Sequence, residues 1–132
     1  MLHRDAIKAY QEAEQDFLVE GADQHSLVQI LYGELLNALD HTHDALERLD
    51  LQAKSASMTK ALSIIHVLNS TLDFEKGGEV AASLAQLYEW ARRKVIEASR
   101  TNVAPIVKEV RRVIAEIADA WDAIGRTGVR AA

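Results

Sequence analysis

Histidine and acidic residues gather around residue 42, where they could form a metal site. Asp40, His41, His43 and Asp44 lie close together, and Glu47 follows one helical turn later. On a helix, residues two positions apart point to nearly opposite sides, so His41 and His43 cannot share an ion. Only pairs such as Asp40 with His43, or His43 with Glu47, face the same way. Two ligands do not make a site, and we interpret the segment as a solvated polar face without a metal.

Two adjacent glycines offer a second chemistry, the binding of an anion. Gly77 and Gly78 precede an apolar stretch, and backbone amides at the start of a helix attract anions. A phosphate-binding loop would continue with Lys and Ser or Thr, whereas this chain continues with Glu79, which repels an anion. The glycines instead predict a helical hairpin, because they adopt backbone angles closed to other residues. One helix should end near Leu72 and the next should begin near Gly78.

The sequence contains no group of residues that indicates nucleophilic catalysis. The chain has no cysteine, which removes disulfides, thiolate nucleophiles and cysteine-based zinc sites together. His3 and His25 have no visible catalytic companion, and His66 is either a polar residue of a groove or an ordinary surface residue. No serine stands beside a base and an orienting group. We therefore expect a protein that is not an enzyme and that needs no cofactor.

Composition indicates a single helical domain over residues 1–132. Hydrophobic residues make up 48% of the chain but aromatic residues only 5%, and there is one proline. This balance favours helix over sheet, and a chain of this length can bury a real core. The fold class that we predict is all-α.

Charge and hydropathy restrict the partners. The net charge of −5 disfavours nucleic acid, whose binding depends on clustered basic residues that neutralise phosphates. No apolar run approaches the roughly 20 residues that span a bilayer, and the first residues begin no signal peptide. We expect a cytoplasmic protein that does not insert into membranes. The most basic segments belong to a solvated face: Arg92, Arg93, Lys94, Arg111 and Arg112.

Apolar residues that recur every three or four positions predict four helices. They cover residues 24 to about 49, 57 to 72, 78 to 98 and 102 to 124, with a cap at Ser55 or Ser57 for the second and Pro105 in the first turn of the fourth. Short loops make sequential helices antiparallel, so we predict an up-down four-helix bundle over residues 24–124. Residues 1–23 form an additional helical or mobile arm, and residues 125–132 form a flexible tail.

The helices carry more apolar residues than the seam of a bundle requires. The widest stripe comprises Leu62, Ile64, Ile65, Val67, Leu68 and Leu72. Either this helix is the most central one, or the stripe lines a groove that receives a partner helix or the chain's own arm. In the second case Ile7, Tyr10 and Phe17 of the arm would dock into the groove. An aspartate at Ile64 or Leu68 would then abolish partner capture.

Three blocks of sequence, residues 27–36, 72–98 and 109–121, point to a family. The first contains Leu31-Tyr32, the second runs from Leu72 through Gly77-Gly78 to Tyr88 and Arg92-Arg93, and the third ends at Trp121. Together with Tyr10-Gln11 in the arm, they resemble the flagellar export chaperone family FliS, which binds flagellin. The chain departs from the family pattern at Asp23-Gln24, Gly33 and Pro105.

The resemblance implies a cytoplasmic chaperone that binds the C-terminal helical segment of flagellin. Such a protein prevents premature polymerisation and aids delivery to the export apparatus, and export gate components and other flagellar regulators are further implied partners. Its N-terminal segment can cover part of the client surface when flagellin is absent. We expect partner contacts at Ile7, Tyr10, Gln11, Leu31, Ile64, Ile65, Leu68, Leu72, Leu84 and Leu87. An alternative hypothesis is a structural or regulatory homo-oligomer that pairs through the same apolar face.

Overall fold

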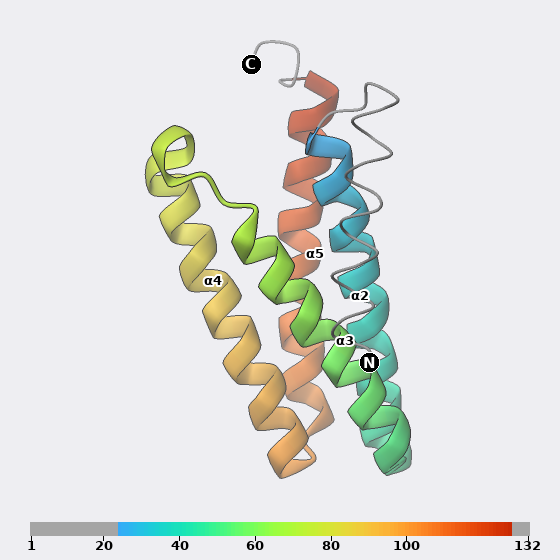
Figure 1. Ribbon diagram of the computed structural model, residues 1–132. Helices are drawn as coiled ribbons and strands as arrows, with labels where there is room; N and C mark the ends of the chain where they lie inside the picture. The colour runs from blue at the N-terminus through green and yellow to red at the C-terminus, as the bar shows by residue number, and fades with distance from the viewer. Residues whose placement is uncertain (1–23, 128–132) are drawn as a thin grey trace.

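Four helices and no strand make up residues 24–127, which are the residues described in the computed structural model (Figure 1). The helices are α2 (Gln24–Arg48), α3 (Leu51–Ser70), α4 (Phe74–Thr101) and α5 (Ala104–Thr127). Helix α2 packs against α3 and α5, and α4 packs against the same two helices from the other side. The predicted all-α bundle is confirmed. The predicted arm over residues 1–23 lies outside the described residues.

Aspartate caps define where the second and third of these helices begin. The Asp50 carboxylate accepts a hydrogen bond from the Ala53 backbone N–H at 3.0 Å, and Asp73 accepts one from Lys76 at the same distance. A capped helix can start immediately after such a residue. The predicted cap at Ser55 or Ser57 is therefore wrong, because Asp50 starts α3 earlier, at Leu51. None of these four described helices is long and apolar enough to cross a membrane.

The two ends of α5 differ in how well the sequence predicted them. Pro105 lies in the first turn, as expected, where its missing N–H costs little. The helix continues through Gly125 to Thr127, beyond the predicted end at Ile124. One glycine does not end a helix that neighbouring residues continue, because its cost is only about 1 kcal/mol relative to alanine.

A kink at Gly78 divides α4 into a short first turn and a long second part. The helix begins at Phe74, before the glycines, whereas the pattern predicted a start near Gly78. Gly78 has φ of 51° and ψ of −123°, which is a conformation that side chains with a Cβ disfavour strongly. The glycine therefore sets the direction in which the long part of α4 leaves the hairpin.

Replacing Gly78 by alanine is expected to lower the free energy of unfolding by about 1–2 kcal/mol, because the backbone must strain or shift. Gly33→Ala is the matched control, since an added Cβ at Gly33 in α2 meets nothing within 4 Å. That variant should be neutral or slightly more stable. Urea unfolding followed by circular dichroism measures both, and equal stability of the two variants would contradict the assignment of strain.

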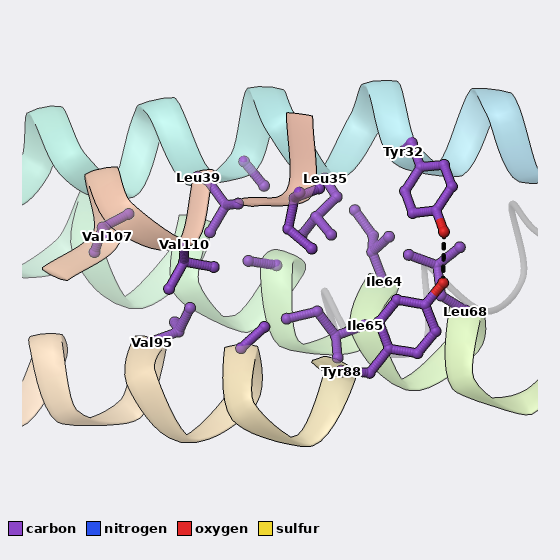
Figure 2. Packing of buried hydrophobic residues seen from close by; sticks show 14 of the residues in the cluster. Tyr32, Leu35, Leu39, Ile64, Ile65, Leu68, Tyr88, Val95, Val107 and Val110 are labelled. Atoms are coloured by element: carbon purple, nitrogen blue, oxygen red, sulfur yellow. Dashed lines mark hydrogen bonds between the residues drawn. The ribbon is translucent and has the colours of Figure 1, made fainter. Parts of the chain in front are cut away.

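The core draws side chains from all four helices (Figure 2). Leu35 and Leu39 of α2, Leu68 of α3, Val95 of α4, and Val107 and Val110 of α5 are all fully buried. Their burial in one cluster is the main source of stability, since each such side chain contributes about 1.5–3 kcal/mol relative to exposure.

A buried pair of tyrosines links α2 to α4 near the hairpin end of the bundle (Figure 2). The hydroxyl oxygens of Tyr32 and Tyr88 lie 2.6 Å apart and form a hydrogen bond. Burial raises the pKa of Tyr32, and burial together with the Tyr32 hydroxyl raises the pKa of Tyr88. Both phenols stay protonated at neutral pH, so one hydroxyl can donate to the other.

The single substitution Tyr32→Phe is expected to cost about 1–3 kcal/mol of stability, because it leaves the buried Tyr88 hydroxyl without its partner. Tyr32→Phe combined with Tyr88→Phe removes both polar groups and should cost less than the sum of the two single changes. Thermal or denaturant unfolding of the four proteins in the cycle measures the coupling. Strict additivity would show that the hydroxyls do not interact.

Candidate functional site

One flank of α4 carries charged residues and the other carries apolar residues. Ala85, Glu89 and Arg92 line a cleft against α3. On the other flank, Val80, Leu84 and Leu87 recur at helical spacing and are exposed or half-buried. Since the main helix neighbours of α4 are α3 and α5, and the cleft lies on the α3 side, this apolar flank faces toward α5.

Helix α5 presents an apolar flank in return. Arg111 donates from its Nε to the Asp40 carboxylate of α2 at 2.8 Å, which directs that side of α5 toward α2. Val113, Ile117 and Ile124 recur on the opposite side, toward α4. We call the two apolar flanks together the α4–α5 face; it comprises Val80, Leu84, Leu87, Val113, Ile117 and Ile124.

Much of the α4–α5 face is accessible to water. Val80 is 68% exposed and Ile124 is 53% exposed, while Leu84 and Ile117 are half-buried at the edge of the core. Figure 1 shows that the N-terminal end of α4 diverges from α5, whereas the C-terminal end of α4 lies close to the N-terminal end of α5. Exposed apolar side chains that gather on one face indicate a surface that binds a partner, and Val80 and Ile124 are the exposed members here.

The residues that the sequence predicted as partner contacts divide into three sets. Leu84 and Leu87 lie on the α4–α5 face, and Leu72 is half-buried in the loop between α3 and α4. Ile7, Tyr10 and Gln11 lie outside the described residues. The remaining four, Leu31, Ile64, Ile65 and Leu68, are buried members of the core cluster.

The burial of these four side chains corrects the prediction of an open groove along residues 62–72. None of them is more than 6% exposed. The physical reason is that α3 packs between α2 and α4 and needs apolar residues on both flanks, as the Figure 2 labels for Ile64, Ile65 and Leu68 illustrate. The stripe residues Ile64, Ile65, Val67 and Leu68 are therefore core residues, while Leu62 and Leu72 are half-buried against the core.

Val80, Val113, Ile117 and Ile124 were not among the predicted contact residues. Each continues an apolar stripe, and a stripe at helical spacing indicates burial. The exposed members, Val80 and Ile124, lie near the ends of α4 and α5 that diverge. One sequence feature that could have suggested this divergence is the Gly77-Gly78 pair, which allows α4 to change direction.

His25, for which the sequence suggested no role, has a structural one. Its ring stacks on Trp121 of α5, with ring centres 4.7 Å apart and planes 7° from parallel. The Trp121 Nε1–H donates to the His25 carbonyl at 2.9 Å, and the His25 Nε2 lies 2.6 Å from the Trp121 carbonyl oxygen. These reciprocal contacts hold the first turn of α2 against α5.

The acidic cluster around His43 does not form a chelating site. The structure adds Asp44 to the pair of His43 and Glu47 that the spacing predicted, and the three groups lie within 4.8 Å of one another. However, His43 turns Nδ1 toward Asp44 at 3.7 Å and Nε2 toward Glu47 at 3.8 Å. Because the carboxylates approach different nitrogens of one ring, they form two separate polar contacts at the surface and do not point toward one common position.

Comparison with known proteins connects this architecture to one family. A family model described as flagellar protein FliS matches residues 6–128. The flagellar secretion chaperone FliS of Salmonella typhimurium is 35% identical over 125 residues, which cover 94% of this chain and 93% of that protein.

Two further relatives show similar coverage. The flagellar secretion chaperone FliSB of Pseudomonas aeruginosa is 34% identical over 119 residues, or 90% of this chain and 94% of that protein. The flagellar secretion chaperone FliS of Vibrio cholerae is 31% identical over 121 residues, or 92% of this chain and 89% of that protein. The similarity therefore extends over nearly the whole length of the chain in each case.

Proposed function

This chain belongs to the FliS family of flagellar secretion chaperones, a non-enzymatic family, and we propose that it binds the C-terminal helical segment of flagellin before export. The bound segment is kept from premature polymerisation in the cytoplasm and is delivered to the export apparatus. Export gate components and flagellar regulators are proposed as further partners of the complex.

The α4–α5 face is the observation that carries this proposal. An amphipathic helix docks by laying side chains at positions i, i+3, i+4 and i+7 into an apolar groove. Val80, Leu84 and Leu87 on one side and Val113, Ile117 and Ile124 on the other offer apolar side chains to such a helix. We place the main client contacts on this face, with Leu72 at its hairpin end.

Release of the client follows from the same physics. A flagellin segment that orders only when it binds loses conformational entropy, which offsets part of the gain from apolar burial. The affinity is then moderate for the area in contact, and no nucleotide hydrolysis is needed to hold the client. The four buried residues Leu31, Ile64, Ile65 and Leu68 belong to the core cluster against which Leu84, Leu87 and Ile117 of the face pack.

The arm provides a proposed competitor for the client. Ile7 and Tyr10 repeat at helical spacing among charged residues, and Gln11 follows them. We place these three residues on the client surface when flagellin is absent. A chain that lacks residues 1–20 should therefore bind the segment more tightly than the full chain, because no competitor must be displaced.

Isothermal titration of the full chain with the isolated C-terminal segment of flagellin tests the proposal. Saturable binding is expected, and flagellin without this segment should not bind. Absence of binding by both the full chain and the form lacking residues 1–20 would contradict the proposal. Sedimentation over a concentration series separates the alternative, because a stable oligomer that stays closed in the presence of flagellin would indicate a homo-oligomeric role.

A further inference from the structure

The end of the bundle opposite the α3–α4 hairpin exposes apolar side chains from two loops. The loop between α2 and α3 and the loop between α4 and α5 lie at this same end (Figure 1). Lys54 of α3 connects them, because its Nζ donates to the Ser99 carbonyl at 3.1 Å and to the Asn102 Oδ1 at 3.4 Å. Three aliphatic residues at this end are each at least 40% exposed, and we call them the loop patch: Leu49, Leu51 and Val103.

The backbone at Leu49 is unusual for a leucine. Helices α2 and α4 are both followed by a residue in the left-handed conformation, Leu49 with φ of 56° and Asn102 with φ of 57°. Asparagine tolerates this conformation, whereas in leucine the Cβ makes it costly. The Leu49 side chain is 72% exposed, so burial in the core does not offset that cost. Leu49 therefore suits a contact outside the bundle better than it suits the turn in which it lies.

Basic residues are concentrated in the half of the bundle that ends at the loop patch. Apart from Lys76 and Arg126, every Lys and Arg of residues 24–127 lies in this half, whereas Asp and Glu are divided about equally between the two halves. The half at the loop patch is therefore net positive, and the half at the hairpin is net negative. Such a charge distribution orients the molecule in the field of an anionic surface.

Two arginines beside the loop patch are available to an anion. Arg48 and Arg100 are exposed, and neither forms an ion pair within residues 24–127. The acidic residues of the same loop have contacts of their own. The Asp50 carboxylate accepts from the Ala53 N–H at 3.0 Å, and a Glu47 oxygen lies 3.8 Å from the His43 Nε2.

We propose that the loop patch docks on the surface of an anionic membrane, where its aliphatic side chains enter the interface and Arg48 and Arg100 pair with lipid phosphates. Each basic residue near an anionic bilayer favours binding, and buried apolar area adds to it. Exposed loops at the end of a bundle suit a flat and fluid surface, whereas a partner helix requires a groove. The contact reaches only the interface and needs no helix that crosses the bilayer.

The proposed contact leaves the α4–α5 face free. Val80 and Ile124, the exposed members of that face, lie at the hairpin end of the bundle, and the loop patch lies at the other end. A chaperone docked in this way can hold its client beside the membrane. Binding of lipid and binding of the client segment are therefore measured separately.

Flotation of the full-length chain with vesicles tests the proposal. We expect binding to vesicles of phosphatidylcholine that contain about 30% phosphatidylglycerol, and affinity lower by about tenfold or more for phosphatidylcholine alone. Salt at about 0.5 M should release most of the bound chain, because it screens the attraction between arginine and phosphate.

Two variants separate the apolar contribution from the charge. Leu49→Asn should weaken vesicle binding by about fivefold or more while the thermal midpoint stays equal or rises, because asparagine tolerates the left-handed backbone. Ile30→Asn is its control, since Ile30 is 43% exposed on α2 in the hairpin half. Arg48→Glu should weaken binding by about tenfold, whereas Lys76→Glu, the same change of charge in the hairpin half, should leave it within about twofold.

Absence of binding to the anionic vesicles by the unmodified chain would overturn the proposal, and so would equal binding by Leu49→Asn and Arg48→Glu. If Arg48→Glu weakens binding but Leu49→Asn does not, the membrane is overturned as the occupant in favour of a soluble acidic partner. Titration of Leu49→Asn with the flagellin segment should give unchanged affinity. Failure of the lipid contact therefore leaves the proposed function standing.

Discussion

Replacing Leu68 by aspartate is expected to unfold the bundle, an effect larger than loss of partner capture alone. Leu68 is 0% exposed and belongs to the cluster that joins all four helices. The variant loses the packing of a leucine and buries a carboxylate with no partner, which costs about 4 kcal/mol or more. That is a large part of the roughly 5–15 kcal/mol that stabilises a typical domain.

Circular dichroism during urea unfolding measures the effect of Leu68→Asp. Ser55→Asp is the matched control, since it adds the same charge to an exposed position of α3 and should change stability by no more than about 0.5 kcal/mol. A Leu68→Asp protein that unfolds as cooperatively as the unmodified chain but no longer captures flagellin would contradict the core assignment. That result would instead indicate that Leu68 lines an open client groove, as one interpretation of the apolar stripe predicted.

The second large effect concerns binding. Val80→Asp combined with Ile124→Asp is expected to weaken capture of the flagellin segment by about 2 kcal/mol or more, or at least thirtyfold. Both side chains are more than half exposed, so neither change should lower the free energy of unfolding by more than about 0.5–1 kcal/mol. The added carboxylates weaken binding because the client would have to bury them on the α4–α5 face, which removes them from water.

Leu51→Asp is the control for this double variant. Leu51 is 68% exposed, as is Val80, but it lies at the first position of α3, at the opposite end of the bundle from the hairpin. Titration with the flagellin segment should give unchanged affinity for Leu51→Asp. Equal loss of affinity in the two proteins would indicate a general effect of added negative charge, and unchanged affinity in both would move the client site away from the α4–α5 face.

Local rules account for most of the fold. Periodic apolar residues predicted four helices, and Pro105 marked the first turn of the last one, because these signals act over a few residues. The start of α3 was missed because two kinds of cap competed in one polar stretch, and Asp50 formed the hydrogen bond that a serine was expected to form.

The candidate site was harder to predict because it depends on how helices are placed relative to one another. An apolar stripe looks the same in sequence whether one neighbour or two cover it. The stripe around Leu68 is buried between two neighbouring helices. The stripe that contains Val80 is partly exposed, at the end of α4 that diverges from α5. The contact of His25 with Trp121 spans 96 positions of the chain, and no local pattern could have indicated it.

Protection of a single thiol on the α4–α5 face tests the central claim most directly. The chain has no cysteine, so Val80→Cys introduces the only reactive thiol, and Gln86→Cys provides one on the outer side of the same helix. The rate of maleimide labelling is measured with and without a saturating amount of the flagellin C-terminal segment. We predict that the segment slows labelling at position 80 by about tenfold or more and leaves labelling at position 86 unchanged. A labelling rate at position 80 that is the same with and without the bound segment would contradict docking on this face.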